Sequence, residues 1–153
     1  MDIKELTKIK GKMTFTLRNA ETGEIEGRLV KRNIVVTEGR AVFAARLASD
    51  TTYSGSINYG ALGTSTTAPA NADTQLGTET FRKAISSYNS VDNIAYLSFF
   101  YTATEVTGTF KEFGNFIDGS AAANSGQLFT HVAIDITKTS SQTLTIDCEY
   151  EIL

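Results

Sequence analysis

The chain has 153 residues, of which 41% are hydrophobic and 20% charged, and its net charge is −3. This length predicts one domain with a core of its own, and the composition excludes a disordered protein. The acidic balance argues against nucleic-acid binding, and the single cysteine excludes an intrachain disulfide. No apolar run approaches the roughly 20 residues of a membrane span, so we expect no membrane insertion.

The first twelve residues are rich in lysine and lack the apolar core of a signal peptide. They therefore predict a protein made in the cytoplasm of its host. Residues 1–12 are too short for a stable isolated helix. Two interpretations stay open: a solvated, flexible terminus, or an arm that docks on a neighbouring subunit through Lys4, Lys8 and Lys10. Residues 13–153 are expected to form the single folded domain.

One helix is predicted, over residues 37–48. Thr37 is its candidate N-cap, and Glu38 suits the positive end of the helix dipole. Its expected apolar stripe consists of Val42, Phe43, Ala45, Leu47 and Ala48.

Period-two alternation of apolar and polar residues predicts strands along the rest of the chain. These segments are residues 13–18, 25–31, 57–62, 79–87, 93–102, 109–117, 128–136 and 144–152. Residues 33–36 either form another strand or continue the one before. Residues 63–72 and 118–126 are small and polar, and are expected to be loops. About eight strands with one short helix predict a mainly β protein, an antiparallel β-sandwich.

The segment 93–102 is apolar on both of its faces. Ile94, Tyr96 and Phe100 share one face, and the other consists of Leu97, Phe99 and Tyr101. Such a strand lies centrally in a sheet or uses one face for contact with another subunit. Leu97, Phe99 and Tyr101 are therefore the candidate subunit interface.

Residues with catalytic potential are few and scattered. His131 is the only histidine and is expected to be structural or on the surface, because a metal site needs several converging ligands. Cys148 lies in an apolar alternation and is expected to be a buried thiol. Glu112 has no evident carboxylate partner of the kind a glycosidase needs. We therefore expect no catalytic, cofactor-binding or metal-binding residues.

A recurrent order of small motifs is the most informative feature of the chain. It begins with the β-branched segment and helix start at residues 34–40 and continues through Gly60, Gly63, Pro69, Asp73, Leu76, Glu79, Arg82, the Glu112-Phe113-Gly114 block and the pair Leu128-Phe129. In this order the motifs resemble a family of small β-rich virion proteins of tailed bacteriophages. The resemblance runs from about residue 13 to residue 152.

The resemblance implies a non-enzymatic virion structural protein. The expected position is tail-associated, in a fibre, baseplate or neck, with a role in particle assembly or host attachment. The expected partners are other copies of the chain in a homo-oligomer, for which the resemblance implies a homotrimer, together with other virion proteins and a host surface receptor. Three alternatives stay open: a capsid decoration protein, a glycan-binding β module, and a small enzyme such as a carbohydrate hydrolase that would use Glu112.

Overall fold

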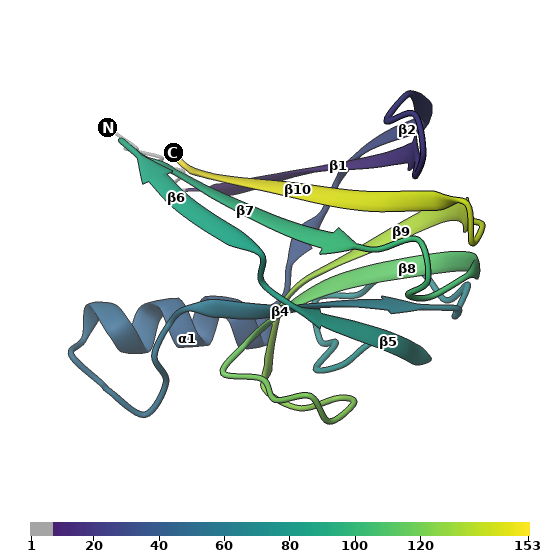
Figure 1. Cartoon of the computed structure of the whole chain (residues 1–153). Helices are drawn as coiled ribbons and strands as arrows, with labels where there is room; N and C mark the ends of the chain where they lie inside the picture. The colour runs from purple at the N-terminus through teal and green to yellow at the C-terminus, as the bar shows by residue number, and fades with distance from the viewer. Residues whose placement is uncertain (1–7) are drawn as a thin grey trace, which may run out of the picture.

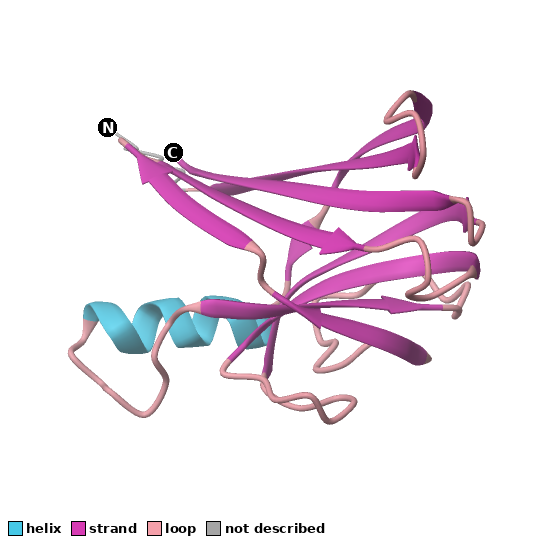
Figure 2. Ribbon diagram, in the orientation of Figure 1, coloured by secondary structure: helices cyan, strands magenta, loops and turns pink. Residues whose placement is uncertain are grey.

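The structure is a computed structural model and describes residues 8–153. Two five-stranded antiparallel sheets face each other, with one short helix beside them (Figures 1 and 2). The mainly β, sandwich-like fold predicted from the sequence is confirmed, with ten strands in place of about eight.

The first sheet, sheet A, has the strand order β2-β1-β10-β7-β6. Its strands are β1 (Ile9–Asn19), β2 (Ile25–Arg32), β6 (Ser87–Val91), β7 (Ile94–Tyr101) and β10 (Gln142–Ile152). β1 and β10 pair along their whole length, from Ile9 opposite Ile152 to Asn19 opposite Gln142. Residues 9–12, predicted to belong to the arm, are therefore part of this sheet, because the inward alternation of Met13 and Phe15 already begins at Ile9.

The second sheet, sheet B, has the strand order β3-β9-β8-β4-β5. Its strands are β3 (Ile34–Val35), β4 (Ile57–Gly63), β5 (Glu79–Ala84), β8 (Gly108–Ile117) and β9 (Gln127–Lys138). The chain leaves sheet B after Ala84 and enters sheet A at Ser87, so the single strand predicted over residues 79–87 is two strands in two sheets. The sequence did not predict β6 as a separate strand, because all its residues are exposed and apolar and polar residues do not alternate along it.

The main core lies between the inner faces of the two sheets. Phe113 from sheet B makes edge-to-face contacts with Phe15 and Phe99 from sheet A, with ring centroids 5.6 and 6.0 Å apart. Tyr101 is also fully buried, and its hydroxyl donates to the Gly60 carbonyl at 3.1 Å. Aromatic packing at one end of the sandwich thus holds the sheets together tightly.

Helix α1 (Thr37–Leu47) follows β3 directly. Its N-cap is Val36 rather than the predicted Thr37, and no side chain caps the first turn. Glu38 instead accepts a hydrogen bond at 2.8 Å from the backbone N–H of Leu128, at the start of β9. The acidic residue in the first turn therefore ties the helix to sheet B.

Only the first half of α1 packs closely. Gly39 lies against β9 so closely that a Cβ there would sit 2.7 Å from the carbonyl oxygen of Phe129. Val42 is buried, but Phe43 is 36% and Leu47 75% exposed. The predicted apolar stripe is therefore only partly buried, because the helix packs chiefly against β9 instead of lying across a sheet.

Candidate functional site

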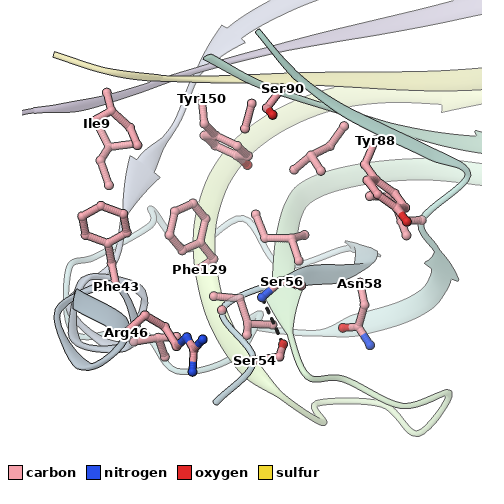
Figure 3. Close-up of a pocket in the computed structure, with 18 of the residues that line it drawn as sticks. Ile9, Phe43, Arg46, Ser54, Ser56, Asn58, Tyr88, Ser90, Phe129 and Tyr150 are labelled. Carbon is pink, nitrogen blue, oxygen red and sulfur yellow. Dashed lines mark hydrogen bonds between the residues drawn. The ribbon is translucent and has the colours of Figure 1, made fainter. Parts of the chain in front are cut away.

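An apolar cleft of about 830 Å³ lies between the two sheets, and α1 forms part of its wall (Figure 3). At the end of the sandwich where α1 lies, sheet A diverges from sheet B (Figure 1). Ile9 from β1 points toward Phe43 of α1, and Phe129 from β9 lies beside Tyr150 from β10. The last two rings meet edge to face at 5.3 Å and close the inner end of the cleft.

The polar groups at the rim of the cleft are mostly engaged within the chain. The Asn58 side chain donates to the Gly119 carbonyl and accepts from the Gly119 N–H, both at 2.8 Å. The Ser54 hydroxyl donates to Asp118, and Arg46 donates to the Asp50 carbonyl at 3.4 Å. The cleft therefore offers an apolar interior, suited to an apolar or ring-shaped group more than to a charged substrate.

A second candidate region is the outer face of sheet B, where the motif residues of the sequence gather. Two segments cover this face: the first loop, residues 64–78, and the second loop, residues 118–126. Leu76 of the first loop inserts into a small apolar cluster on this face, which consists of Val36, Ala61, Leu76, Phe116 and Leu128. The face is thus covered by a minor core of its own.

Glu112, on β8, fixes the first loop to sheet B. Its carboxylate, on a side chain only 1% exposed, accepts hydrogen bonds from the backbone N–H groups of Ser65 (3.2 Å), Gly77 (2.9 Å) and Thr78 (2.7 Å). Nε2 of His131 lies 2.9 Å from the same carboxylate. Four polar contacts satisfy this buried charge, which would otherwise be strongly destabilising.

His131 joins Glu112 to a second carboxylate. Its Nδ1 lies 2.8 Å from Asp73 Oδ2, which also accepts from the Ala70 N–H at 2.7 Å. The imidazole stands between the two carboxylates, so the three side chains do not converge on one point. The described residues contain no cluster of three or more histidine, cysteine or acidic side chains able to hold a metal ion.

Arg82 fixes the second loop in a similar way. It pairs with Glu79 at 2.8 and 2.9 Å, and both side chains are less than 5% exposed. Nη1 donates to the carbonyls of Ser120 and Ser125, at 2.9 and 3.1 Å. The guanidinium also lies over the Phe116 ring, 4.6 Å from its centroid. Arg82 therefore links the edge of sheet B to a loop about 40 residues further along the chain.

The predicted subunit-interface residues of β7 lie elsewhere than expected. Phe99 and Tyr101 are completely buried between the sheets, and Leu97 is half-buried at the cleft. Within this fold Phe99 and Tyr101 cannot contact a second subunit, which corrects the predicted interface. The exposed apolar residues of β7 are Tyr96 (36%) and Phe100 (42%), on the opposite face.

Of the three lysine residues predicted to dock the arm, the structure describes Lys8 and Lys10. Lys4 lies outside the described residues. Lys8 and Lys10 are exposed, and Lys10 stands opposite Glu151 in the β1–β10 ladder. Lys10 therefore belongs to the outer face of sheet A and not to a separate arm.

Cys148 is buried, as the sequence predicts. Burial raises the pKa of its thiol well above the ordinary value, so the reactive thiolate form is disfavoured. The hydroxyl of neighbouring Tyr150 bonds to Thr130 at 2.9 Å and to Asn115. This polar group inside the core is structural.

Lys138 is a buried cation that sequence reasoning missed. Its ammonium donates to the carbonyls of Ala103 (3.1 Å), Glu105 (2.9 Å) and Thr139 (3.4 Å). Burial lowers the pKa of this lysine. The even-numbered alternation of β9, which places Ile134 and Ile136 inward, also points Lys138 inward and was the available signal.

Comparisons with known proteins give no match, whether to family models, curated protein sequences or solved structures. Among the described residues, no helix has the length and apolar character needed to cross a membrane.

Proposed function

We propose that this chain is a non-enzymatic structural subunit of a tailed-bacteriophage virion, associated with the tail as part of a fibre, baseplate or neck. It acts there in particle assembly or host attachment. The proposal is carried by the structural role of four motif residues, which are Asp73, Glu79, Arg82 and Glu112. All four fix two loops to one face of the sandwich, Asp73 through His131 of β9 and Glu79 through the backbone N–H of Asn124.

These roles support a structural protein more than an enzyme. A catalytic acid, base or nucleophile must present a polar atom to its substrate. The Glu112 carboxylate and the Arg82 guanidinium are instead buried and bonded to the chain. Rigidly held loops on a sandwich are suited to contact with other proteins, because a preorganised surface loses little entropy on binding.

Mass spectrometry of purified particles tests this proposal. The particles come from the phage whose genome encodes the chain, and the chain is expected at a fixed copy number per particle. Its presence in the infected-cell lysate but absence from particles would contradict the proposal. Immunogold labelling then locates it: label on the tail is expected, whereas label on the head would favour the capsid decoration alternative, to which the exposed Lys8 could contribute.

A glycan-binding module is the second candidate, and the cleft is the observation that favours it. Its volume of about 830 Å³ lies within the range of small-ligand sites, roughly 300–1,000 Å³. Phe43 and Tyr88 offer partly exposed rings on its walls for stacking against sugars. Calorimetric titration with bacterial surface oligosaccharides should then show binding that Phe43→Ala abolishes. Leu47→Ala, on the same helix but outside the cleft, is the matched control.

A further inference from the structure

The outer face of sheet A is not covered by any other element among residues 8–153 (Figure 1). Its charges lie in separate bands. The basic band, on β1 and β2, consists of Lys10, Lys12, Arg18, Arg28 and Arg32. The acidic band, on the adjacent β10, consists of Asp147, Glu149 and Glu151. Beyond it, β7 presents the exposed rings of Tyr96 and Phe100.

The strand register aligns these groups in rows across the sheet. One row runs Arg32, Lys12, Glu149, Tyr96 from β2 to β7. The row on one side of it contains Lys10 opposite Glu151, and a row on the other side runs from Arg28 to Phe100 through Thr16 and Thr145. The row between those of Lys12 and Arg28 consists of Val30, Thr14, Asp147 and Ser98 and carries one charge. The cations of these rows therefore lie on β1 and β2, and the anions and aromatic rings lie on β10 and β7.

This order is complementary to itself. Consider a second copy placed face to face and related by a two-fold axis that runs along the strands between β1 and β10. The rotation exchanges β1 with β10 and β2 with β7 while it keeps each row at its own height. Lys12 then faces Glu149 of the second copy, and Arg32 faces Tyr96 of the second copy, where a cation–π contact can form.

We propose that the outer face of sheet A is the surface through which two copies of this chain pair. The Lys12 ammonium already lies 2.6 Å from Glu149 Oε2, which leaves Oε1 of the carboxylate open to Lys12 of the second copy. Two such pairs form a square of alternating charges. A network of this kind gains more than an isolated surface pair does.

The size of the face agrees with this inference. The two-fold axis between β1 and β10 places four strands of each copy, β2, β1, β10 and β7, opposite those of the other. Strands of about eight residues at ~3.3 Å each, spaced ~4.8 Å, give an overlap of roughly 25 by 20 Å. Pairing then buries on the order of 500 Å² per copy, which is near the lower limit for a specific interface and fits a weak, reversible dimer. Val30 is 53% and Phe100 42% exposed, and both would be covered. Face-to-face sheets tolerate the natural twist at about 30°.

The test begins with the solution mass of the purified chain, measured by light scattering over a range of concentrations. We expect a reversible monomer–dimer equilibrium that weakens as salt rises, because the contacts are electrostatic. A mass that stays monomeric up to the limit of solubility would overturn the inference. A trimer would also overturn the inference, because a two-fold contact through this one face joins only two copies.

Two charge-reversed variants then locate the contact. Lys10→Glu/Lys12→Glu makes the two central rows acidic on β1 and β10, and Glu149→Lys/Glu151→Lys makes them basic. Each variant alone should dimerise at least about 100-fold more weakly than the wild type, because like charges would meet. An equimolar mixture of the two should form a heterodimer. Misfolding cannot explain this rescue, since each variant must offer an intact face.

The control exchanges an ion pair on the other sheet. Lys111 and Asp135 lie 2.9 Å apart on β8 and β9, away from the proposed surface. Lys111→Glu/Asp135→Lys should leave the dimer constant unchanged. Wild-type masses for both sheet A variants, or a mixture that fails to associate, would overturn the inference. These outcomes concern self-association alone, so they are independent of whether particles contain the chain.

Discussion

The two outer faces of the sandwich treat charge in opposite ways. On sheet B, Glu112 and Arg82 are almost fully buried, and each has several partners from loops that cover the face. On sheet A, Lys12 and Glu149 form a pair that is more than 30% exposed. Buried charges with many partners determine stability, whereas exposed charges arranged in bands are available for recognition.

The largest effect is expected at Glu112. Glu112→Leu leaves three backbone N–H groups and His131 without their acceptor, so we expect a loss of about 3–5 kcal/mol in the free energy of unfolding. Urea denaturation measures it. Glu149→Leu is the matched change on sheet A, with an expected loss of about 1 kcal/mol or less. Equal losses at the two positions would refute the contrast between the faces.

Arg82 should come next. Arg82→Leu leaves Glu79 buried without its cation and frees the second loop, for an expected loss of about 3 kcal/mol. Hydrogen exchange should show faster exchange in residues 118–126 and unchanged exchange in β1. The double variant Glu79→Leu/Arg82→Leu should recover part of the stability, because no unpaired charge remains. A double variant less stable than Arg82→Leu would show that the ion pair is not the main contribution of Arg82.

The sequence predicted the strands of the fold better than it predicted the buried polar residues that hold the loops in place. Alternation located most strands, and β10 shows why: Leu144, Ile146 and Cys148 point inward at every second position. The loop-fixing roles of Glu112 and Arg82 could not be predicted, because the loop groups that Glu112 binds lie 34 to 47 residues away from it and those that Arg82 binds lie 38 to 43 residues away. Side-chain patterns report local geometry and do not report such distant contacts.

The face of β7 shows a different limit. Apolar residues on both sides left the inward face undetermined, and the predicted interface fell on the core side. The missing information was the pairing with β10, which sets Leu97 opposite Cys148 and Phe99 opposite Ile146. Cross-strand neighbours share a face, so the one-sided pattern of β10 decides the orientation of β7. Strand order, which comes from the whole fold, is needed for that step.

The stability of the fold should decrease at alkaline pH because of buried titratable groups in the core. Burial raises the pKa of Cys148 above its ordinary value of about 9, so the folded state keeps a proton that the unfolded state releases. This contribution to stability is complete below about pH 9 and is lost as pH rises. The expected loss is about 1 kcal/mol between pH 9 and pH 10, because the thiol of the unfolded chain is only half ionised at pH 9. Cys148→Ala should flatten this part of the stability curve, measured by urea denaturation; an unchanged slope would assign it to Tyr101 and Tyr150, whose pKa values burial also raises.

The smallest effect on stability is expected from Lys12→Met. This change breaks a pair that is 38% exposed at the lysine and 33% at the glutamate, so the free energy of unfolding should change by less than about 1 kcal/mol. The same change removes two cations from the centre of the proposed dimer, one from each copy, and should weaken association measurably. Urea denaturation and light scattering on one sample separate these quantities. If Lys12→Met destabilised the fold as much as Glu112→Leu, the charges of sheet A would be structural as well, and the division between a stabilising face and a recognition face would not hold.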